Sequence, residues 1–252
     1  AVHVKVDTGM HRVGAHPGDA AVIVASARAS RRLDVEGLWT HLAVADEPDR
    51  ADDFTAHQLD AFAAVVDDLA RRGPRPPLLH AANSAGALLH PAARLDLVRC
   101  GIAAYGIPPA PGRDGGVPLQ PAMTLRAEVT FAKRLPAGEG LSYGLHYVTS
   151  EPTVIATVPL GYADGVPRRL AFTGGEVLIG GQRRPIAGAV TMDQLLVDCG
   201  RDADVSVGDE VVLIGSQGDD RITADEWAGR LDTIAYEIVC GIGARVPRIY
   251  RP

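Results

Sequence analysis

Polar and cationic side chains stand where the short apolar runs of the first 105 residues end. These positions are Lys5 with Asp7 and Arg12, then His41, then Asn83 with Ser84, and finally Arg99 with Gly101 and Ile102. In parallel βα folds, functional residues gather at strand ends on one face. A buried strand often ends in polar residues, so each position alone is unremarkable. Together, cations with no acid pair and no metal-ligand cluster indicate an anionic ligand and no metal.

The tetrapeptide from Asn83 to Gly86 stands where a predicted strand turns into a helix. Free N–H groups, the Ser84 hydroxyl and the positive end of the helix dipole can bind a phosphate. Gly101 would allow a second backbone approach to the same group. An ordinary Ser84 N-cap explains the tetrapeptide at least as well, so these residues alone leave both interpretations open.

Lys5 and Lys133 are the two lysines of the chain. A strand-end lysine whose pKa is lowered by burial can form a Schiff base, so spacing alone favours Lys5 as a covalent lysine. Lys133 lies among charged neighbours in a predicted strand, and we expect it on a solvated face.

Three stretches of the second half place polar residues among glycines: residues 141–144, 161–165 and 191–194. Tight turns with half-buried tyrosine rings explain them. A tyrosine that acts as a base needs nearby cations to lower its pKa from about 10. Without further context, turns are the favoured interpretation.

The first part of the chain alternates apolar runs with helical patterns, which predicts parallel βα units over residues 1–115. We expect strands at 2–6, 35–42, 77–80 and 97–102, and helices at 18–32, 52–71 and 84–89. A (β/α)8 barrel needs eight such units in about 250 residues. Four units predict either a small open α/β layer or a barrel whose other half is absent.

Residues 108–118 are rich in Pro and Gly and predict a linker. A mainly β domain is expected over 116–252. Its predicted strands are 123–134, 153–159, 175–179, 195–198 and 210–214, and its predicted helices lie near 224–231 and 233–240.

The bulk composition is that of an ordinary globular protein: 252 residues, 46% hydrophobic, 22% charged, net charge −6. We expect no nucleic-acid surface and no membrane anchor, because apolar stretches fall far short of the roughly 20 residues that span a bilayer. No secretory signal is visible, and three scattered cysteines predict neither a disulfide framework nor a zinc site. A cytoplasmic protein is expected. The start at Ala1, without Met and inside a predicted strand, suggests truncation.

Eight segments in sequence order resemble the alanine racemase family and cover essentially the whole chain. They are residues 4–12, 39–43, 80–84, 98–102, 141–144, 161–165, 192–194 and 236–248. The resemblance implies a (β/α)8 barrel that binds pyridoxal 5'-phosphate (PLP), then a mainly β domain, in a head-to-tail homodimer with shared active sites. It implies interconversion of L-alanine and D-alanine, which supplies peptidoglycan synthesis.

In this family the Schiff-base lysine ends the first strand of the barrel. The resemblance therefore implies that the chain is the back part of an alanine racemase, with the second half of the barrel at 1–115. It also implies that the N-terminal part with that lysine is lacking and that the chain is inactive alone.

The resemblance assigns the cofactor contacts. Arg99 would hydrogen-bond the pyridine nitrogen, supported by His41. A guanidinium there disfavours protonation of the ring, since two nearby cations repel, and the ring is then a weaker electron sink. The phosphate would be held by Ser84, Gly101, Ile102 and Tyr236, with Asn83 beside it.

The remaining roles also follow from the resemblance. Lys5 matches a position often carbamylated by CO2, where the carbamate would orient Arg12, and this replaces its role as covalent lysine. Arg12 would contact the PLP phenolic oxygen and the substrate carboxylate. Tyr143 would be the second base, since racemisation needs a base on each face of the α-carbon. From the other subunit, Tyr162 would shape the entrance, and the Met192 backbone with Asp193 would reach the pocket and bind substrate. Ala189 stands where many relatives carry an arginine in the entry corridor.

Three alternatives remain. A PLP decarboxylase of the same fold would use a carboxylate at the pyridine nitrogen and a catalytic cysteine, which Arg99 and Tyr143 argue against. A racemase of another small amino acid, such as serine, is harder to exclude. The chain could also be a non-catalytic truncated fragment.

Overall fold

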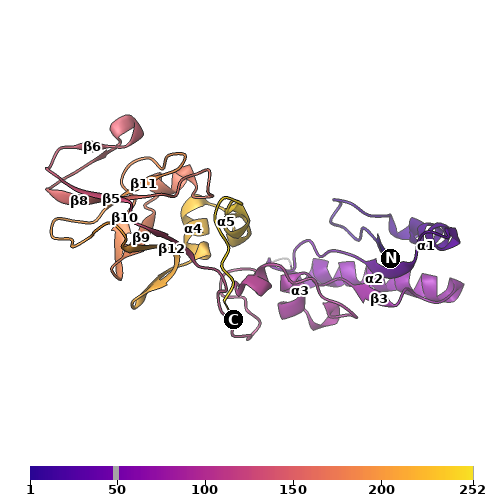
Figure 1. Ribbon diagram of the computed structural model, residues 1–252. Coiled ribbons are helices and arrows are strands. Elements are labelled where there is room, and N and C mark those ends of the chain that lie inside the picture. The colour runs from indigo at the N-terminus through magenta and orange to yellow at the C-terminus, as the bar shows by residue number, and fades with distance from the viewer. Residues whose placement is uncertain (48–50, 252) are drawn as a thin grey trace. The chain divides into compact units, whose positions relative to one another are not determined.

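The computed structural model describes residues 1–47 and 51–251, and the chain divides into two compact units. They comprise Ala1–Ala122 and Met123–Pro252, the indigo-to-magenta and magenta-to-yellow parts of Figure 1. The sequence places this division at 115/116, a few residues earlier. Each unit is described by itself below.

A parallel three-stranded sheet forms the centre of the first unit, in the order β1-β2-β3. The strands are β1 (Val2–Lys5), β2 (Val35–Trp39) and β3 (Leu78–His80), and the helices are α1 (Ala20–Ala29), α2 (Ala51–Arg72) and α3 (Ser84–Leu89). Short 3-10 turns are η1 (Pro17–Asp19), η2 (Pro91–Ala93) and η3 (Ile102–Tyr105). The first three predicted strands and all three predicted helices are confirmed.

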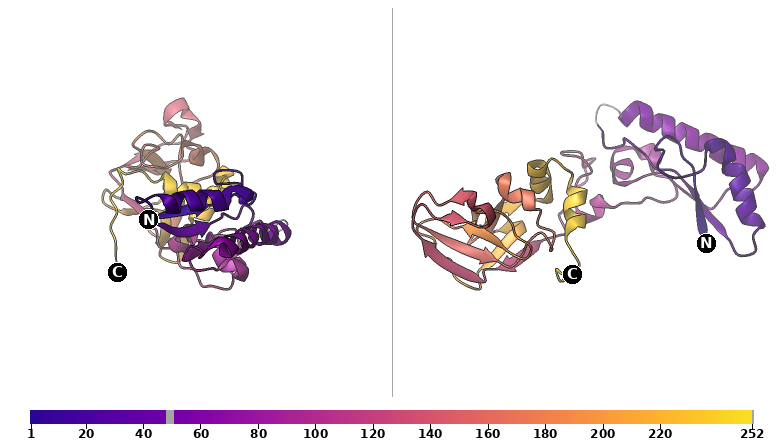
Figure 2. Two further views of the ribbon diagram at one scale, coloured as in Figure 1. Left: turned by 90° about the vertical axis from the view of Figure 1, so that its right-hand side faces the viewer. Right: turned by 90° about the horizontal axis from the view of Figure 1, so that it is seen from above.

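The two faces of this sheet differ in character because successive strand residues point to opposite sides. Val4, Leu38 and Leu79 pack in the core with side chains of α1 and α2, among them Phe62 of α2. Figure 2 (right) shows the long α2 running beside the strands. Burial of this apolar surface holds the layer together. The opposite face carries the polar and aromatic residues of the candidate site.

The fourth strand predicted at 97–102 is not formed. The segment is tied by isolated backbone bonds to β3, from Asp96 N to Leu79 O, and to the loop after it, from Arg99 N to Ala82 O, both 3.0 Å. The Asp96 side chain also accepts from the Leu79 amide at 2.8 Å. A side-chain oxygen thus takes the place that a strand carbonyl would fill in a ladder, so the prediction of four strands is wrong for the described residues.

The Pro- and Gly-rich segment 108–118 belongs to the first unit and packs on it. A Cβ on Gly115, whose φ is +65°, would lie 2.5 Å from the Leu88 carbonyl oxygen. Just beyond the segment, the Ala122 amide donates to the Tyr105 carbonyl at 2.9 Å. The predicted linker is therefore held against α3 and η3, because glycine permits a close backbone approach there.

The second unit is mainly β, as predicted. A five-stranded sheet has the order β10-β9-β12-β13 with β4 also paired to β12; a three-stranded sheet has the order β11-β8-β5, and β6 pairs with β7. The strands are β4 (Leu125–Glu128), β5 (Phe131–Leu135), β6 (Gly140–Leu141), β7 (Tyr147–Val148), β8 (Thr153–Val158), β9 (Glu176–Ile179), β10 (Gln182–Pro185), β11 (Leu195–Asp198), β12 (Glu210–Gln217) and β13 (Asp220–Ile222).

The single strand predicted at 123–134 is two strands in different sheets. The break falls where the Val129 amide bonds to Asp209 O and the Thr130 amide bonds to Thr157 O, both at 2.9 Å. Consecutive residues thus pair with different sheets. The alternation of apolar and polar residues continues across the break through the buried Val129, so the sequence contains no sign of the corner.

The unit also contains turns η4 (Tyr143–Leu145) and η5 (Arg168–Phe172) and ends with α4 (Ala224–Leu231) and α5 (Ala235–Gly241), which lie together in Figure 1. Both predicted helices are confirmed. Helix α4 begins where the Thr223 hydroxyl accepts from the Glu226 amide at 3.0 Å, an N-cap that satisfies a free helix donor. Among the described residues, no helix is long and apolar enough to cross a bilayer.

Candidate active site

Arg99 joins the carboxyl ends of β2 and β3. Its Nη1 donates to His80 Nδ1 at 2.6 Å, and its Nη2 donates to the carbonyls of Thr40 and Ala81 at 2.9 and 3.1 Å. Nη2 also lies 3.2 Å from His41 Nδ1. The structure therefore brings Arg99 and His41 together. His80, which the sequence did not single out as a site residue, is a further direct partner of the guanidinium.

The Trp39 ring underlies these cations on the polar face of the sheet. The Arg99 Cζ lies 4.7 Å and the Lys5 Nζ 5.3 Å from its centroid. His80 stacks on the same ring at 5.6 Å with an interplanar angle of 8°. Cation–π attraction and stacking thus hold Arg99, Lys5 and His80 around one rigid indole.

The buried position of these groups sets their protonation. Burial, and after it the Arg99 charge, lowers the pKa of both His41 and His80 to about 4. Both imidazoles are therefore neutral near neutral pH and can accept the Arg99 hydrogens. Burial also lowers the Lys5 pKa, with Arg12 and Arg99 acting in the same direction and Asp7 against it. A lowered pKa makes the Lys5 amine easier to deprotonate.

Lys5 lies beneath the loop that carries Arg12. Its Nζ donates to the Val13 carbonyl at 2.7 Å. Asp7 shapes the loop by accepting from the amide of His11 at 3.0 Å, which lets His11 adopt a left-handed φ of 57°. Arg12 is exposed on this loop. Lys5, at the end of β1, thus supports the loop of Arg12 and is close enough for the Arg12 charge to lower its pKa.

Ser84 and Gly101 are in direct contact. The Ser84 hydroxyl accepts from the amides of Gly101 at 3.0 Å and Ala103 at 3.3 Å. The expected Ser84 N-cap is wrong, because Asn83 caps α3 by accepting from the Gly86 amide at 2.9 Å. Ser84 is the first helical residue instead. A Cβ on Gly101 would meet nothing within 4 Å, so open space adjoins this backbone. Ile102 is buried beside it.

Gln58, on α2, is a fully buried residue that the sequence analysis missed. Its amide nitrogen donates to the His41 carbonyl at 3.0 Å and to the Thr8 hydroxyl at 3.2 Å. Its amide oxygen accepts from the Ala43 amide at 2.9 Å. One side chain therefore fixes the loop after β2, including His41. The available signal was a polar residue within the apolar stripe of a predicted amphipathic helix.

We expect Gln58→Leu to lower the free energy of unfolding by about 3 kcal/mol, because it leaves buried polar partners unsatisfied at about 1–3 kcal/mol each. Denaturant titration of the purified protein measures this. Asp60→Leu, at an exposed position of the same helix, is the matched control and should change stability by no more than about 0.5 kcal/mol. Equal unfolding midpoints for the two variants would contradict the role of Gln58.

In the second unit, Tyr143 is presented outward on a strained turn. Ser142 and Leu145 have left-handed φ values of 60° and 49°, and the Ser142 hydroxyl donates to the Ala189 carbonyl at 2.7 Å. The Tyr143 side chain is 75% exposed and lines a pocket of about 450 Å3 with residues including Thr191. The expectation of a half-buried, packed ring is therefore wrong for Tyr143.

The loops that carry Tyr162 and Met192 are locked together by their backbones. The Tyr162 amide donates to Thr191 O and the Ala163 amide to Met192 O, both at 3.0 Å. A Cβ on Gly161 would lie 2.3 Å from Met192 O, so only glycine fits. Tyr162, predicted to shape the entrance, is thus a neighbour of Met192 and Asp193, predicted to bind substrate. The predicted phosphate ligand Tyr236 lies on α5 of the same unit.

Known proteins resemble the chain over both units. The family model described as the alanine racemase N-terminal domain matches residues 1–109. The model of the alanine racemase C-terminal domain matches residues 122–250, more than half of the chain. The chain belongs to the alanine racemase family. The match of the first model does not support the expectation that the N-terminal part with the lysine is lacking, nor the expected inactivity that was drawn from it.

Individual alanine racemases are similar along nearly the whole chain. One from Symbiobacterium thermophilum is 52% identical over 249 residues, covering 99% of this chain and 65% of that protein. One from Thermobifida fusca is 50% identical over 253 residues, covering 99% and 66%. The crystal structure of an alanine racemase from Streptomyces lavendulae has a TM-score of 0.89 and 44% identity, covering 99% and 66%. The chain thus spans slightly under two thirds of the length of these alanine racemases.

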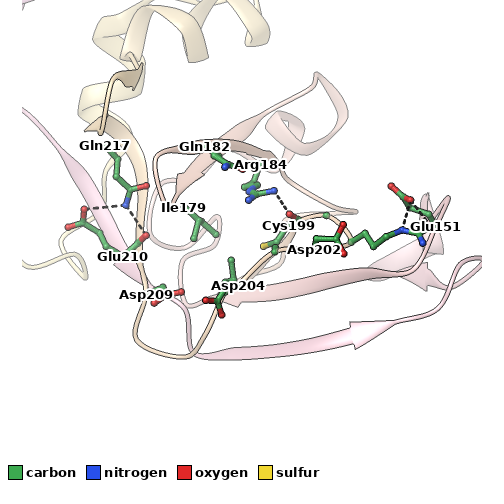
Figure 3. A pocket seen from close by; sticks show the side chains of 15 residues that line it. Glu151, Ile179, Gln182, Arg184, Cys199, Asp202, Asp204, Asp209, Glu210 and Gln217 are labelled. Atoms are coloured by element: carbon green, nitrogen blue, oxygen red, sulfur yellow. Dashed lines mark hydrogen bonds and ion pairs between the residues drawn. The ribbon is translucent and has the colours of Figure 1, made fainter.

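A cavity of about 820 Å3 in the second unit is lined by none of the residues predicted for alanine racemase chemistry. Figure 3 shows its acidic lining, which includes Asp202, Asp204 and Asp209, with the Arg184 guanidinium donating to the Cys199 carbonyl. Gln217 Nε2 closes one side by donating to the Glu210 carbonyl at 3.0 Å. We assign this cavity no role in the site.

Proposed function

We propose that the whole protein is a PLP-dependent alanine racemase that interconverts L-alanine and D-alanine for peptidoglycan synthesis. The observation that carries this proposal is the Arg99 guanidinium held between two neutral imidazoles at the ends of parallel strands. Such a donor suits a pyridine nitrogen that is to stay unprotonated. The racemase from Bacillus anthracis with bound L-Ala-P, at a TM-score of 0.90 and 38% identity over 99% of this chain and 64% of its own, supports the substrate class.

The residues present fit the cofactor. Among the described residues, the Arg99 Nε hydrogen and one Nη1 hydrogen have no partner, so they are free to donate to a ring nitrogen. Open space adjoins Gly101, where a phosphate could approach the backbone. We propose that Ser84, Gly101, Ile102 and Tyr236 hold the phosphate, with Asn83 beside it. When bound, PLP supplies the electron withdrawal that acidifies the substrate α-hydrogen.

The substrate contacts are proposals of the same kind. Arg12 would bind the substrate carboxylate and the phenolic oxygen, oriented by Lys5 as a carbamate. A lowered Lys5 pKa favours the neutral amine that reacts with CO2. In a homodimer, Tyr143 would reach the site of the other protomer as the base for L-alanine. Tyr162 would shape its entrance, and the Met192 backbone with Asp193 would contact the substrate. The exposure of the Tyr143 side chain supports a role at such a shared site.

We propose that the covalent lysine lies outside these 252 residues. The chain has two lysines: Lys5 donates to the Val13 carbonyl under its loop, and Lys133 is exposed on β5. We assign Lys5 to the support of Arg12 and Lys133 to the solvated surface, so neither is the lysine that would bind PLP covalently. A cytoplasmic location likewise stays a prediction from the sequence.

The test is an assay of the full-length protein with PLP and L-alanine, followed by stereospecific detection of D-alanine. We expect D-alanine to accumulate until both enantiomers are equal in concentration. L-Serine in a parallel reaction tests the alternative substrate and should be converted more slowly. Formation of CO2 without D-alanine would contradict the proposal and favour a decarboxylase. Protein freed of PLP and then reloaded is the control for dependence on the cofactor.

A further inference from the structure

A series of hydrogen bonds begins at Arg99 and passes through two histidines to a glutamate. Arg99 Nη1 lies 2.6 Å from His80 Nδ1. His80 Nε2 lies 2.8 Å from His3 Nδ1, and His3 Nε2 lies 3.0 Å from the Glu36 carboxylate. These hydrogen bonds thus connect Arg99 to the negative charge of Glu36 across all three strands of the first sheet.

The direction of each bond is fixed by the chemistry of its ends. A guanidinium only donates, so His80 Nδ1 must accept and the His80 proton is on Nε2. That proton is donated to His3 Nδ1, which places the His3 proton on Nε2. A carboxylate only accepts, so Glu36 receives this last hydrogen. The hydrogen bonds therefore hold both imidazoles as the Nε2–H tautomer.

The backbone is built to permit this arrangement. Between β1 and β2, Val2 pairs with Val35 and His3 pairs with Gly37, so Glu36 is the extra residue of a β-bulge. Bulges redirect a side chain and are rare between parallel strands. Gly37 makes room for the ring, because a Cβ there would lie 2.1 Å from His3 Nδ1. The bulge and the glycine are separate local features that serve the same contact.

We propose that Glu36 and His3 are positioning residues that lock His80 in the Nε2–H tautomer and thereby aim the Arg99 guanidinium. The locked Nδ1 lone pair holds one Nη1 hydrogen, while Nη2 is held by the Thr40 and Ala81 carbonyls. The second Nη1 hydrogen and the Nε hydrogen are then left to donate to a ligand. The aim toward the cofactor ring rests on the proposed function; the tautomer lock does not. Without an acceptor at residue 36, His3 can turn its proton to Nδ1, which forces His80 to present a hydrogen to Arg99.

Full-length protein labelled with 15N-histidine and freed of cofactor tests the lock through imidazole 15N chemical shifts near neutral pH. We expect wild-type His80, assigned by its loss in His80→Gln, to show an unprotonated Nδ1. Glu36→Leu should give a mixture of His80 tautomers. Glu36→Gln keeps an acceptor oxygen and should resemble the wild type. Glu47→Leu, an exposed glutamate beyond β2, is the matched control and should leave the shifts unchanged.

In the PLP-loaded enzyme, Glu36→Leu should lower kcat for alanine about tenfold, with a smaller change in KM. This is the size of effect seen when a group that orients a site residue by hydrogen bonding is removed. Gly37→Ala, which displaces the His3 ring, should give the same spectrum as Glu36→Leu; if it does not fold, Glu36→Leu alone decides.

Unchanged His80 shifts in Glu36→Leu would overturn the proposal, as would equal shifts in Glu36→Gln and Glu36→Leu. Wild-type protein without racemase activity would overturn the proposed function and leave the tautomer test intact.

Discussion

Tyr143→Phe in the full-length enzyme should lower the rate of α-hydrogen exchange from L-alanine about a thousandfold, within the range of general acid–base effects. The substitution removes only the hydroxyl that would take the proton. Exchange from D-alanine should persist, because the base on the opposite face is unchanged. Incubation of each enantiomer in D2O, followed by mass spectrometry, measures the two rates separately. The enzyme would then deuterate D-alanine without inverting it.

Tyr147→Phe is the matched control for this experiment. Tyr147 belongs to the same unit, and its hydroxyl donates to Asp198 at 2.7 Å. Burial and the Asp198 carboxylate raise the Tyr147 pKa, so this phenol is unsuited to act as a base. Both exchange rates should remain near those of the wild type. Equal loss of exchange from both enantiomers in Tyr143→Phe would contradict a one-sided role for Tyr143.

Arg99→Lys should lower kcat about a hundredfold, the lower end of the range for removing one preorganised donor. Lysine keeps the charge but loses the planar fork. It cannot donate at once to His80 Nδ1, to the Thr40 and Ala81 carbonyls and to a ring nitrogen as the guanidinium can. Steady-state racemisation kinetics measure the effect, and PLP absorbance shows whether the cofactor is still bound.

Arg94→Lys provides the comparison. Arg94 is an exposed arginine of the same unit. It donates from Nε and Nη2 to the Ala87 and Leu88 carbonyls at 2.7 and 3.1 Å. Its contacts cap the end of α3 and do not involve His80 or His41. We expect racemisation by this variant to stay within about twofold of the wild type. A similar loss in both variants would assign the effect to stability of the unit.

The sequence predicted those elements whose pattern is local. The alternating apolar residues of β1 and the amphipathic pattern of α2 each lie within one continuous segment of sequence, and both elements are present in the structure. The strand expected at 97–102 failed because its place in the ladder depends on Asp96, whose side chain accepts from the Leu79 amide. The corner at Val129 was hidden because burial continues through it. Both errors arise from contacts between distant residues.

The site shows the same division. Arg99 and His41 could be named from their positions after apolar runs and from the family resemblance. His3, Glu36 and Gln58 could not, because each acts through a partner far along the chain: His3 through His80, and Gln58 through Thr8 and the loop at His41. A glutamate at a strand start or a glutamine on a helix has no local pattern that distinguishes it.

The interlocked backbones at Gly161 and Met192 constrain how such a protein can acquire new substrates. Neither loop can be lengthened or shifted without disrupting its neighbour, so remodelling of these loops would not readily change the width of the proposed entrance. Diversification at this point is confined to exchanging the outward-facing groups of Tyr162 and Met192, both substantially exposed. A library randomised at these two positions should therefore yield folded variants far more often than one with insertions in either loop.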